Sequence, residues 1–205
     1  MQRFITLAFS ALLLLSLNAA TPETHYTVIV SLDGFRWDYP DMYKTPNLDR
    51  MAADGVKAVM LPSYPASTFP NHYTLATGLV PDHHGIINNT FWDVKNRRQY
   101  SMGDSATRNN PEYYLGEPIW ITAQKQGVKT GNMYWVGSDI AIKKSHPTYY
   151  RPWNAKPFLT FEQRIDTVLT WLQKPEPERP RLIMLYFEKT GSDGSGYNYA
   201  KAFGH

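Results

Sequence analysis

The 205-residue sequence contains no cysteine, so it forms no disulfide bonds and carries no lipid anchor attached through a cysteine. It also lacks an excess of one charge, because 21 Lys and Arg residues face 18 Asp and Glu residues, for a formal net charge of +3. The basic residues are scattered along the chain. This pattern argues against a nucleic-acid-binding face built from a basic patch.

Only one long hydrophobic run is present, from Phe4 to Leu17. Arg3 precedes it and the small residues Ala19 and Ala20 follow it, which is the pattern of a secretory signal peptide. The run is shorter than the ~20 apolar residues that span a bilayer comfortably. We therefore expect cleavage after residue 20, export to a periplasm or to the extracellular space, and no membrane anchor afterwards. A retained anchor is the alternative.

The rest of the chain alternates apolar runs with helical patterns. The runs 26–32 and 182–187 are continuous and apolar, which predicts buried parallel strands, and a shorter strand is expected at 57–61. Helices are expected at 46–54 and 117–126, each followed by a glycine. This order predicts a single α/β domain with a mostly parallel sheet and helices on both of its faces.

The clearest helix is expected at 160–173. Thr160 and Gln163 have the spacing of a capping box, in which each side chain bonds to the backbone N–H of the other. Apolar residues then recur at the spacing of one helical face, which we expect to pack against the core: Ile165, Val168, Leu169 and Leu172.

Two candidate functional residues follow predicted strands. Asp33 comes directly after the first strand, and ligands of open α/β sheets collect where strands end, so it is a candidate metal ligand. A turn-forming role before Gly34 is equally consistent with the sequence. Thr68 lies two residues before Pro70, and proline suits the first position of a helix that we expect to end at Gly78. The Thr68 hydroxyl would therefore lie beside a helix terminus that attracts anions. The local alternative is a capping turn.

Polar side chains after this helix are weaker candidates. His83 and His84 are adjacent in a turn-rich segment, and neighbouring residues rarely aim both rings at one ion, so a structural role is favoured. The amide of Asn89 could return towards Thr68 and donate to an anionic oxygen.

The order of three segments resembles a known family. They read VIVSLDGFRWD, TPNLDRMAADGV and PSYPASTFPNHYTLATGLVPDHHGIINN. Together they are similar to the N-terminal half of the nucleotide pyrophosphatase/phosphodiesterase family, a branch of the alkaline phosphatase superfamily. The resemblance covers positions 26 to about 188. It implies an alkaline phosphatase-like fold with its C-terminal portion missing, and an exported phosphodiesterase that acts on small phosphodiesters or nucleotides.

The resemblance also implies roles for individual residues. Asp33 and Thr68 would be ligands in a site of two zinc ions, with Thr68 as the nucleophile of a phospho-threonine intermediate. Asn89 would stabilise a non-bridging oxygen. Phe69 and Tyr186 would pack around the substrate, with Tyr150 or Tyr149 as a further candidate.

The chain departs from the family pattern after Glu188. The family places an Asp, and a His four residues later, where this sequence has Gly191 and Ser195. Neither residue binds zinc as Asp and His do. We therefore interpret residues 21–188 as the N-terminal part of the catalytic domain and 189–205 as a divergent or frame-disrupted tail, and we expect weak zinc binding, little hydrolysis and an exposed sheet edge. The alternatives are a phosphomonoesterase, phosphonate hydrolase or sulfatase, or a non-catalytic degenerate fragment.

Overall fold

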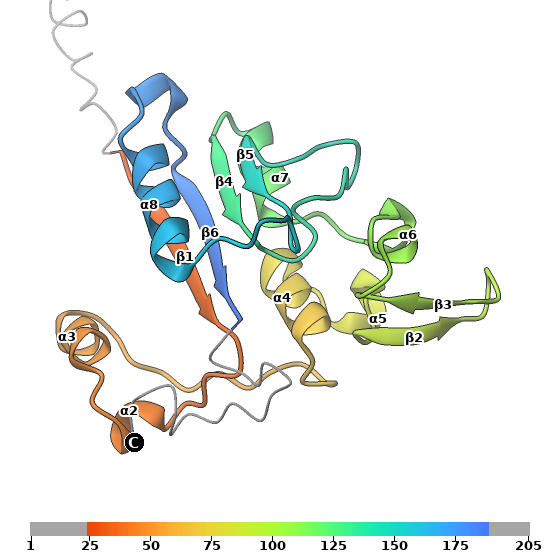
Figure 1. Ribbon diagram of the computed structural model, residues 1–205, viewed down its shortest axis with the longest axis horizontal. Coiled ribbons are helices and arrows are strands. Elements are labelled where there is room, and N and C mark those ends of the chain that lie inside the picture. The colour runs from red at the N-terminus through yellow and green to blue at the C-terminus, as the bar shows by residue number, and fades with distance from the viewer. Residues whose placement is uncertain (1–23, 189–205) are drawn as a thin grey trace, which may run out of the picture.

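The computed structural model describes residues 24–188, which fold as one α/β unit (Figure 1). The expected signal peptide (1–20) and divergent tail (189–205, with Gly191 and Ser195) lie outside the described residues. Within residues 24–188, no helix is long and apolar enough to cross a membrane.

A four-stranded sheet forms the centre of the fold. Its strands are β1 (Thr27–Leu32), β6 (Leu182–Phe187), β4 (Thr130–Met133) and β5 (Tyr149–Arg151), in that spatial order. Every neighbouring pair is parallel. The prediction of a mostly parallel sheet is therefore confirmed. Its two longest strands, β1 and β6, are the continuous apolar runs of the sequence.

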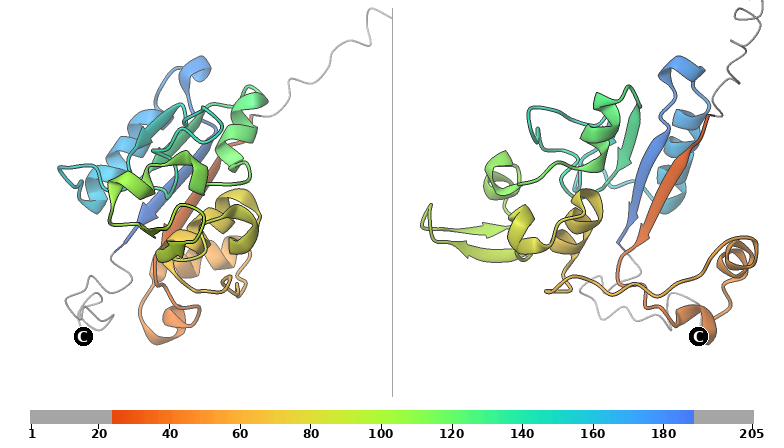
Figure 2. Two further views of the ribbon diagram at one scale, coloured as in Figure 1. Left: turned by 90° about the vertical axis from the view of Figure 1, so that its right-hand side faces the viewer. Right: turned by 180° about the vertical axis from the view of Figure 1, so that it is seen from behind.

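Helices cover both faces of this sheet. The ring of Phe161 in α8 (Phe161–Leu172) packs edge-on against Phe187 of β6, with 4.7 Å between centroids. Its neighbour Tyr186 points to the opposite face, where it packs against His72 of α4 (Thr68–Thr77). Figure 2 shows α4 and α8 on opposite sides of the strands. Helix α7 (Ile119–Lys125) lies on the α4 side.

The remaining elements are short and lie around this centre. An antiparallel ribbon of β2 and β3 extends away from the sheet (Figure 1). The other helices and strands are α2 (Tyr39–Met42), α3 (Pro46–Asp54), α5 (Pro81–His84), β2 (Thr90–Asp93), β3 (Arg98–Ser101), α6 (Ser105–Arg108), η1 (Pro111–Tyr113) and η2 (Glu176–Glu178).

The core is largely aromatic. Its largest fully buried apolar side chains are Trp120, Trp135, Tyr73, Tyr100, Tyr134 and Phe69. Gly131 lets α8 approach β4 closely, because a Cβ at this position would lie only 2.8 Å from the indole of Trp171. The conformation of β4 is therefore tied to the packing of α8.

The capping prediction for α8 is confirmed: Thr160 accepts from Gln163 N, and the Gln163 side chain accepts from Thr160 N. Its packing prediction is only partly right. Val168 is buried, whereas Ile165 and Leu169 are 45% and 48% exposed. These two side chains extend beyond the part of the sheet that α8 covers.

Two other local predictions were wrong. Among residues 24–188, β1 is an edge strand rather than a buried one, with Val28 and Val30 44% and 51% exposed. Residues 57–61 have no regular secondary structure and pair with no strand among residues 24–188. The prediction of a helix at 46–54 is confirmed by α3, although none of its residues is buried. An apolar pattern thus indicates an element, but it does not show whether another element covers it.

Candidate active site

The site forms where β1 and β6 end and α4 begins. Asp33, the first residue after β1, is held there by a bond from its N–H to Phe187 O of 2.9 Å. Its carboxylate oxygen Oδ2 accepts from Thr68 Oγ1 at 3.0 Å and from Tyr186 OH at 2.7 Å. Thr68 and Tyr186, which lie 35 and 153 positions from Asp33 in the sequence, thus donate to the same oxygen of Asp33. The expected meeting of Asp33 and Thr68 at one sheet edge is what the structure has.

Helix α4 begins earlier than expected. Ser67 is the N-cap residue, Thr68 is the first helical residue, and Pro70 is the third. Proline is tolerated there because N–H groups of the first turn have no intrahelical acceptor. Gly78 ends the helix in the left-handed conformation, with φ of 69°, as predicted. The Thr68 hydroxyl therefore projects from the first turn rather than from the preceding loop.

Asn71 fixes the loop that leads into α4. Its side-chain oxygen accepts from Ser63 N at 2.7 Å, and its amide nitrogen donates to Pro65 O at 2.9 Å and Ser67 O at 3.0 Å. One side chain therefore satisfies several backbone groups of residues 63–67. This gives the start of α4, and with it Thr68, a defined position.

Asn89 reaches the same helix terminus from the loop after α5. Its Oδ1 accepts from Phe69 N at 2.8 Å. Because the oxygen is used in this way, the amide NH₂ group remains as the donor of Asn89. Its neighbour Asn88 accepts from Ser67 Oγ at 3.1 Å. Within residues 24–188, the Thr68 N–H has no hydrogen-bond acceptor, so it is a second donor at this terminus.

A cleft of about 570 Å³ opens over these groups. Its lining combines hydroxyl, carboxylate and amide side chains with apolar residues of the 60–66 segment. Among its lining residues are Asp33, Gly34, Met60, Ser63, Ser67, Thr68, Asn71, His72 and Asn89. It is large enough to hold a small-molecule ligand.

His72 supports the site from beneath. Its Nδ1 lies 2.7 Å from Thr68 O and its Nε2 lies 2.7 Å from Ser31 Oγ. A carbonyl only accepts, so Nδ1 carries the proton, and Nε2 of the neutral ring accepts from Ser31. Burial lowers the pKa of His72, although the Thr68 carbonyl and the charge of Asp33 oppose this effect. His72 therefore links β1 to the first turn of α4 in its neutral form.

Three aromatic rings form a cluster beside the site. Trp153 packs edge-on against Phe69 with 4.9 Å between centroids, and its ring is tilted against that of Tyr186 with 4.8 Å between centroids. Burial and the Asp33 carboxylate both raise the pKa of Tyr186, which keeps its hydroxyl a donor. Sequence reasoning identified Phe69 and Tyr186 but missed Trp153. The sequence signal for Trp153 was its place in segment 137–154, which is irregular and rich in aromatic residues.

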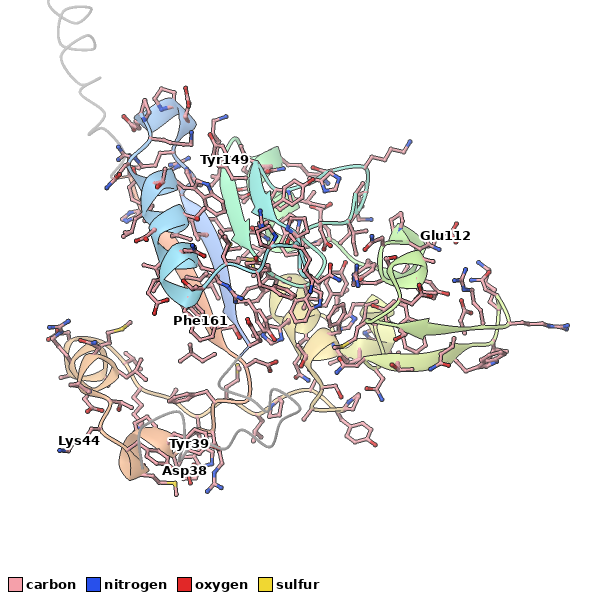
Figure 3. The ribbon with its side chains drawn as sticks, in the orientation of Figure 1. Asp38, Tyr39, Lys44, Glu112, Tyr149 and Phe161 are labelled. Carbon is pink, nitrogen blue, oxygen red and sulfur yellow. The ribbon has the colours of Figure 1, made fainter. Side chains whose placement is uncertain are left out.

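The other aromatic candidates lie elsewhere. Tyr150 stacks on His146, with 5.0 Å between ring centroids, and belongs to β5, the strand farthest from β1. Tyr149 donates to Glu178 O at 3.0 Å. Figure 3 shows Tyr149 at the end of the sheet opposite Phe161, which lies nearer the ends of β1 and β6. The structure does not bring either tyrosine to the cleft.

The described residues supply few metal ligands. Asp33 and Thr68 provide two neighbouring oxygens of the type that a divalent cation accepts, but no group of three or more His, Asp or Glu side chains suited to a metal occurs within 24–188. His84 is fully buried, its Nε2 lies 3.1 Å from Pro70 O, and its Nδ1 accepts from Ile86 N. Both of its ring nitrogens thus serve the packing of α4 against α5.

The chain is similar in sequence to several known proteins. The chain is 43% identical over 178 residues to human ectonucleotide pyrophosphatase/phosphodiesterase family member 1, and 41% identical over 178 residues to bovine family member 3. Venom phosphodiesterase 2 of Crotalus adamanteus is 39% identical over 173 residues. These matches cover 85%, 85% and 83% of this chain but only 19%, 20% and 21% of those proteins, so the chain spans about a fifth of their length.

Solved structures give the same result. Murine ectonucleotide pyrophosphatase/phosphodiesterase 5 matches with a TM-score of 0.75 and 31% identity, covering 87% of this chain and 48% of that one. An inactive variant of the murine protein in complex with AMP matches equally well. Residues 27–202 match the family described as type I phosphodiesterase / nucleotide pyrophosphatase. The chain therefore belongs to the type I phosphodiesterase / nucleotide pyrophosphatase family.

Proposed function

We propose that this chain carries the nucleophile and the anion-binding donors of a phosphodiester-hydrolysing site. The proposed substrates are small phosphodiesters or nucleotides. The observation that carries the proposal is the Thr68 hydroxyl at the first turn of α4, bonded to Asp33 Oδ2 at 3.0 Å and bordering the 570 Å³ cleft. A helix N-terminus attracts a phosphoryl group to this place.

Thr68 is the proposed nucleophile. Its oxygen forms a bond to phosphorus while the bond from phosphorus to the leaving oxygen breaks, and water later cleaves the phospho-threonine. Because the hydroxyl hydrogen is directed at Asp33, the oxygen lone pairs are turned away from the carboxylate. A threonine hydroxyl is a poor nucleophile at its ordinary pKa. A metal ion bound to the Thr68 oxygen would lower the pKa of this hydroxyl.

Two zinc ions are the proposed cofactors, with Asp33 and Thr68 as ligands. The proposal rests on their two adjacent oxygens, which are suitable first ligands but are too few to hold an ion tightly on their own. We therefore propose that the 205-residue chain binds zinc weakly and turns over slowly. Two tightly held zinc ions per chain, measured by elemental analysis after dialysis, would contradict this part of the proposal.

Asn89 and the Thr68 N–H are the proposed donors to the non-bridging oxygens of the substrate. The support is that Asn89 Oδ1 is used by Phe69 N, which orients the amide group at the same helix terminus. Preorganised donors of this kind stabilise the charge that develops on the oxygens during phosphoryl transfer. Next to them, Trp153 is the proposed contact for an apolar or aromatic part of the substrate, because it is the only partly exposed ring of the three. Phe69 and Tyr186 are buried behind it, and their predicted role around the substrate would be to support this ring. We further propose that the chain is exported after removal of residues 1–20.

The test is the capture of phosphate on Thr68. The chain is incubated with an aryl phosphodiester and zinc, quenched in acid, digested, and analysed by mass spectrometry for a phosphorylated residue. We expect phosphate on Thr68 and its absence in Thr68→Ala, with labelling retained in Ser67→Ala, the neighbouring hydroxyl. Phosphate on Ser67, or equal release of the aryl group by Thr68→Ala, would overturn the proposal.

A non-catalytic phosphate-binding role is the second candidate, because residues 24–188 contain no group of three metal-ligating side chains. The two candidates differ in their products. Binding of AMP measured by calorimetry, without any phospho-threonine and without hydrolysis of the diester or the matching monoester, would favour binding alone.

A further inference from the structure

Another cavity lies at the end of the sheet opposite the cleft over Thr68. Its volume is about 340 Å³, and it is lined by Gly127, Lys129, Glu176, Pro177, Arg179 and Arg181. These residues precede β4 and β6. In Figure 1 both strands begin at the top of the sheet, whereas β1 and β6 end at the bottom. Because β6 has six residues and a strand rises ~3.3 Å per residue, the two sites lie about 20 Å apart.

The strands that begin at this cavity are the inner strands of the described sheet. β4 pairs with β6 on one side and with β5 on the other, and β6 pairs with β4 and β1. The walls of the cavity therefore belong to strands that are hydrogen-bonded along both edges. Their backbone positions are fixed by these pairings.

Sheet pairing brings two cations of the cavity together. Arg181 N donates to Lys129 O at 2.9 Å, one residue before the register pair of Thr130 and Leu182. Lys129 and Arg181 therefore occupy neighbouring positions on adjacent strands, and both residues are half-buried. Like charges at neighbouring positions of a sheet repel each other. An anion bound between them would replace this repulsion by attraction to both groups.

Arg179 is held at the same cavity by uncharged acceptors. Its Nε donates to Lys174 O at 2.9 Å, and its Nη1 donates to Tyr26 OH at 3.2 Å. A guanidinium group has five N–H donors, so donors remain beyond these two bonds. Arg179 is therefore oriented by the protein itself and keeps its positive charge and spare donors for a ligand.

The segment that carries Arg179 and Arg181 is stiff. Pro175, Pro177 and Pro180 lie in it, and each proline ring fixes its own φ angle. The segment is also closed on itself, because Arg179 N donates to Pro175 O at 3.0 Å, and Pro180 is buried. A site on such a segment loses little conformational freedom when a ligand binds.

Positive charge predominates in the cavity. Three basic side chains line it, against the single carboxylate of Glu176, which is exposed. Among the described residues, no ion pair joins Glu176 to any of the three. Guanidinium groups match the geometry of phosphate-type oxyanions through paired hydrogen bonds, and a lysine ammonium binds them as a point charge. The volume is that of a small-molecule site.

We propose that this cavity binds a free, doubly charged oxyanion of the size of inorganic phosphate, held by Lys129, Arg179 and Arg181. The site is separate from the cleft over Thr68. It does not depend on the hydrolase activity proposed above, so a chain that hydrolyses no phosphodiester would still bind phosphate here.

The first test locates phosphate binding by NMR. Amide resonances of the nitrogen-15-labelled 205-residue chain are followed during a titration with inorganic phosphate, while chloride keeps the ionic strength constant. We expect saturable shifts of the Gly127, Lys129 and Arg181 amides, because these residues line the cavity. Phosphate may not act there through ionic strength alone, so chloride without phosphate should leave these amides unshifted. Amides of the cavity that stay in place, or that shift without saturating, would overturn the proposal.

The second test changes the charge of the cavity in both directions. Arg181→Gln and Lys129→Gln each remove a cation, and the phosphate affinity measured at the cavity amides should fall by about tenfold or more. Glu176→Gln removes the carboxylate and should raise this affinity by about threefold. The control is Lys95→Gln, which removes an exposed cation in the turn between β2 and β3 and should leave the affinity unchanged.

Arg181→Lys separates charge from geometry. It keeps the positive charge but lacks the paired donors of a guanidinium, so phosphate binding should weaken by about threefold or more. Circular dichroism establishes that each variant folds, and Arg181→Lys and Lys129→Gln decide the matter if Arg181→Gln does not. Equal affinities in Lys129→Gln, Glu176→Gln and the parent would refute the site.

Discussion

Tyr186 and Asp33 are joined by a 2.7 Å hydrogen bond, in which the tyrosine hydroxyl donates to the same carboxylate oxygen that accepts from Thr68. The bond links β6 to the residue that follows β1. Tyr186 is 3% exposed, whereas Asp33 is half-buried and lines the cleft, so the bond is partly buried. A side chain predicted to lie near the substrate thus also orients the carboxylate beside the proposed nucleophile.

Replacing Tyr186 by Phe should lower stability and alter alkaline titration. Removing a donor to a partly buried carboxylate costs about 1–3 kcal/mol, measured by urea unfolding. Burial raises the pKa values of Tyr186, Tyr73 and Tyr114, and that of Tyr100 to about 12. A raised pKa contributes stability that is complete below the unfolded value of about 10 and is lost as the pH rises above it. In absorbance titrations, Tyr186→Phe should remove one tyrosine from the late-ionising group.

The control for this change is Tyr64→Phe, because Tyr64 is 93% exposed. It should leave the unfolding free energy unchanged. A Tyr186→Phe chain as stable as the parent would show that the bond to Asp33 contributes nothing to the fold.

Acid should destabilise the protein through His72. Because burial lowers the pKa of this histidine, the unfolded chain takes up a proton first, so the stability that it contributes is present above about pH 6.5 and is lost as the pH falls. The slope reaches at most about 1.4 kcal/mol per pH unit for one histidine. His72→Gln should be less stable at pH 7.5 but should lose less stability on going to pH 5, as measured by urea unfolding at both values.

Two other histidines serve as comparisons for His72→Gln. His84 also has a lowered pKa through burial, so some acid sensitivity should persist in His72→Gln. The side chain of His83 is 68% exposed, and His83→Gln should leave the unfolding free energy at pH 7.5 unchanged. An unchanged acid slope in His72→Gln would assign the effect to other groups.

The α8 capping box should contribute measurable stability. Thr160→Ala removes the acceptor for Gln163 N and should cost about 0.5–2 kcal/mol in urea unfolding. The matched control is Thr170→Ala in the same helix, whose hydroxyl bonds to Asp166 O within α8. Since alanine has the higher helix propensity, this control should be neutral or slightly stabilising. Equal losses in the two variants would exclude a specific capping effect.

Local patterns were sufficient for the elements and for part of the site. The apolar runs identified β1 and β6, the capping box identified the start of α8, and Gly78 identified the end of α4. These features depend on residues close in sequence. The meeting of Asp33 and Thr68 was expected from two neighbouring parallel strands. It forms through the start of α4 instead, because residues 57–61 pair with no strand within 24–188.

Features set by distant contacts were not predictable in this way. An apolar run does not reveal whether another element covers it, so the exposure of Val28 and Leu169 was missed. Trp153 reaches Phe69 only because the segment after β4 folds back over α4, and nothing near Trp153 in the sequence indicates that path. The position of Thr68 within α4 was missed because Pro70 is tolerated throughout the first helical turn.

The most informative substitution in the cleft is Asn89→Asp, because it separates the two proposed roles of Asn89. Aspartate keeps an oxygen that accepts from Phe69 N and places a negative charge at a helix N-terminus, so stability should stay within about 0.5 kcal/mol of the parent. It lacks the NH₂ donor and repels an anion. Binding of AMP, measured by calorimetry, should therefore weaken by about tenfold or more.

Asn89→Ala completes the comparison, since it removes both the acceptor and the donor. It leaves the Phe69 N–H without its partner and should cost about 1–3 kcal/mol of stability in addition to the loss of AMP binding. If Asn89 only caps α4 and its side chain does not face the bound anion, Asn89→Asp will bind AMP as the parent does and Asn89→Ala alone will be impaired. If the amide donates to the ligand, both variants will lose affinity while only Asn89→Ala loses stability, and this contrast is the one that the geometry at Phe69 predicts.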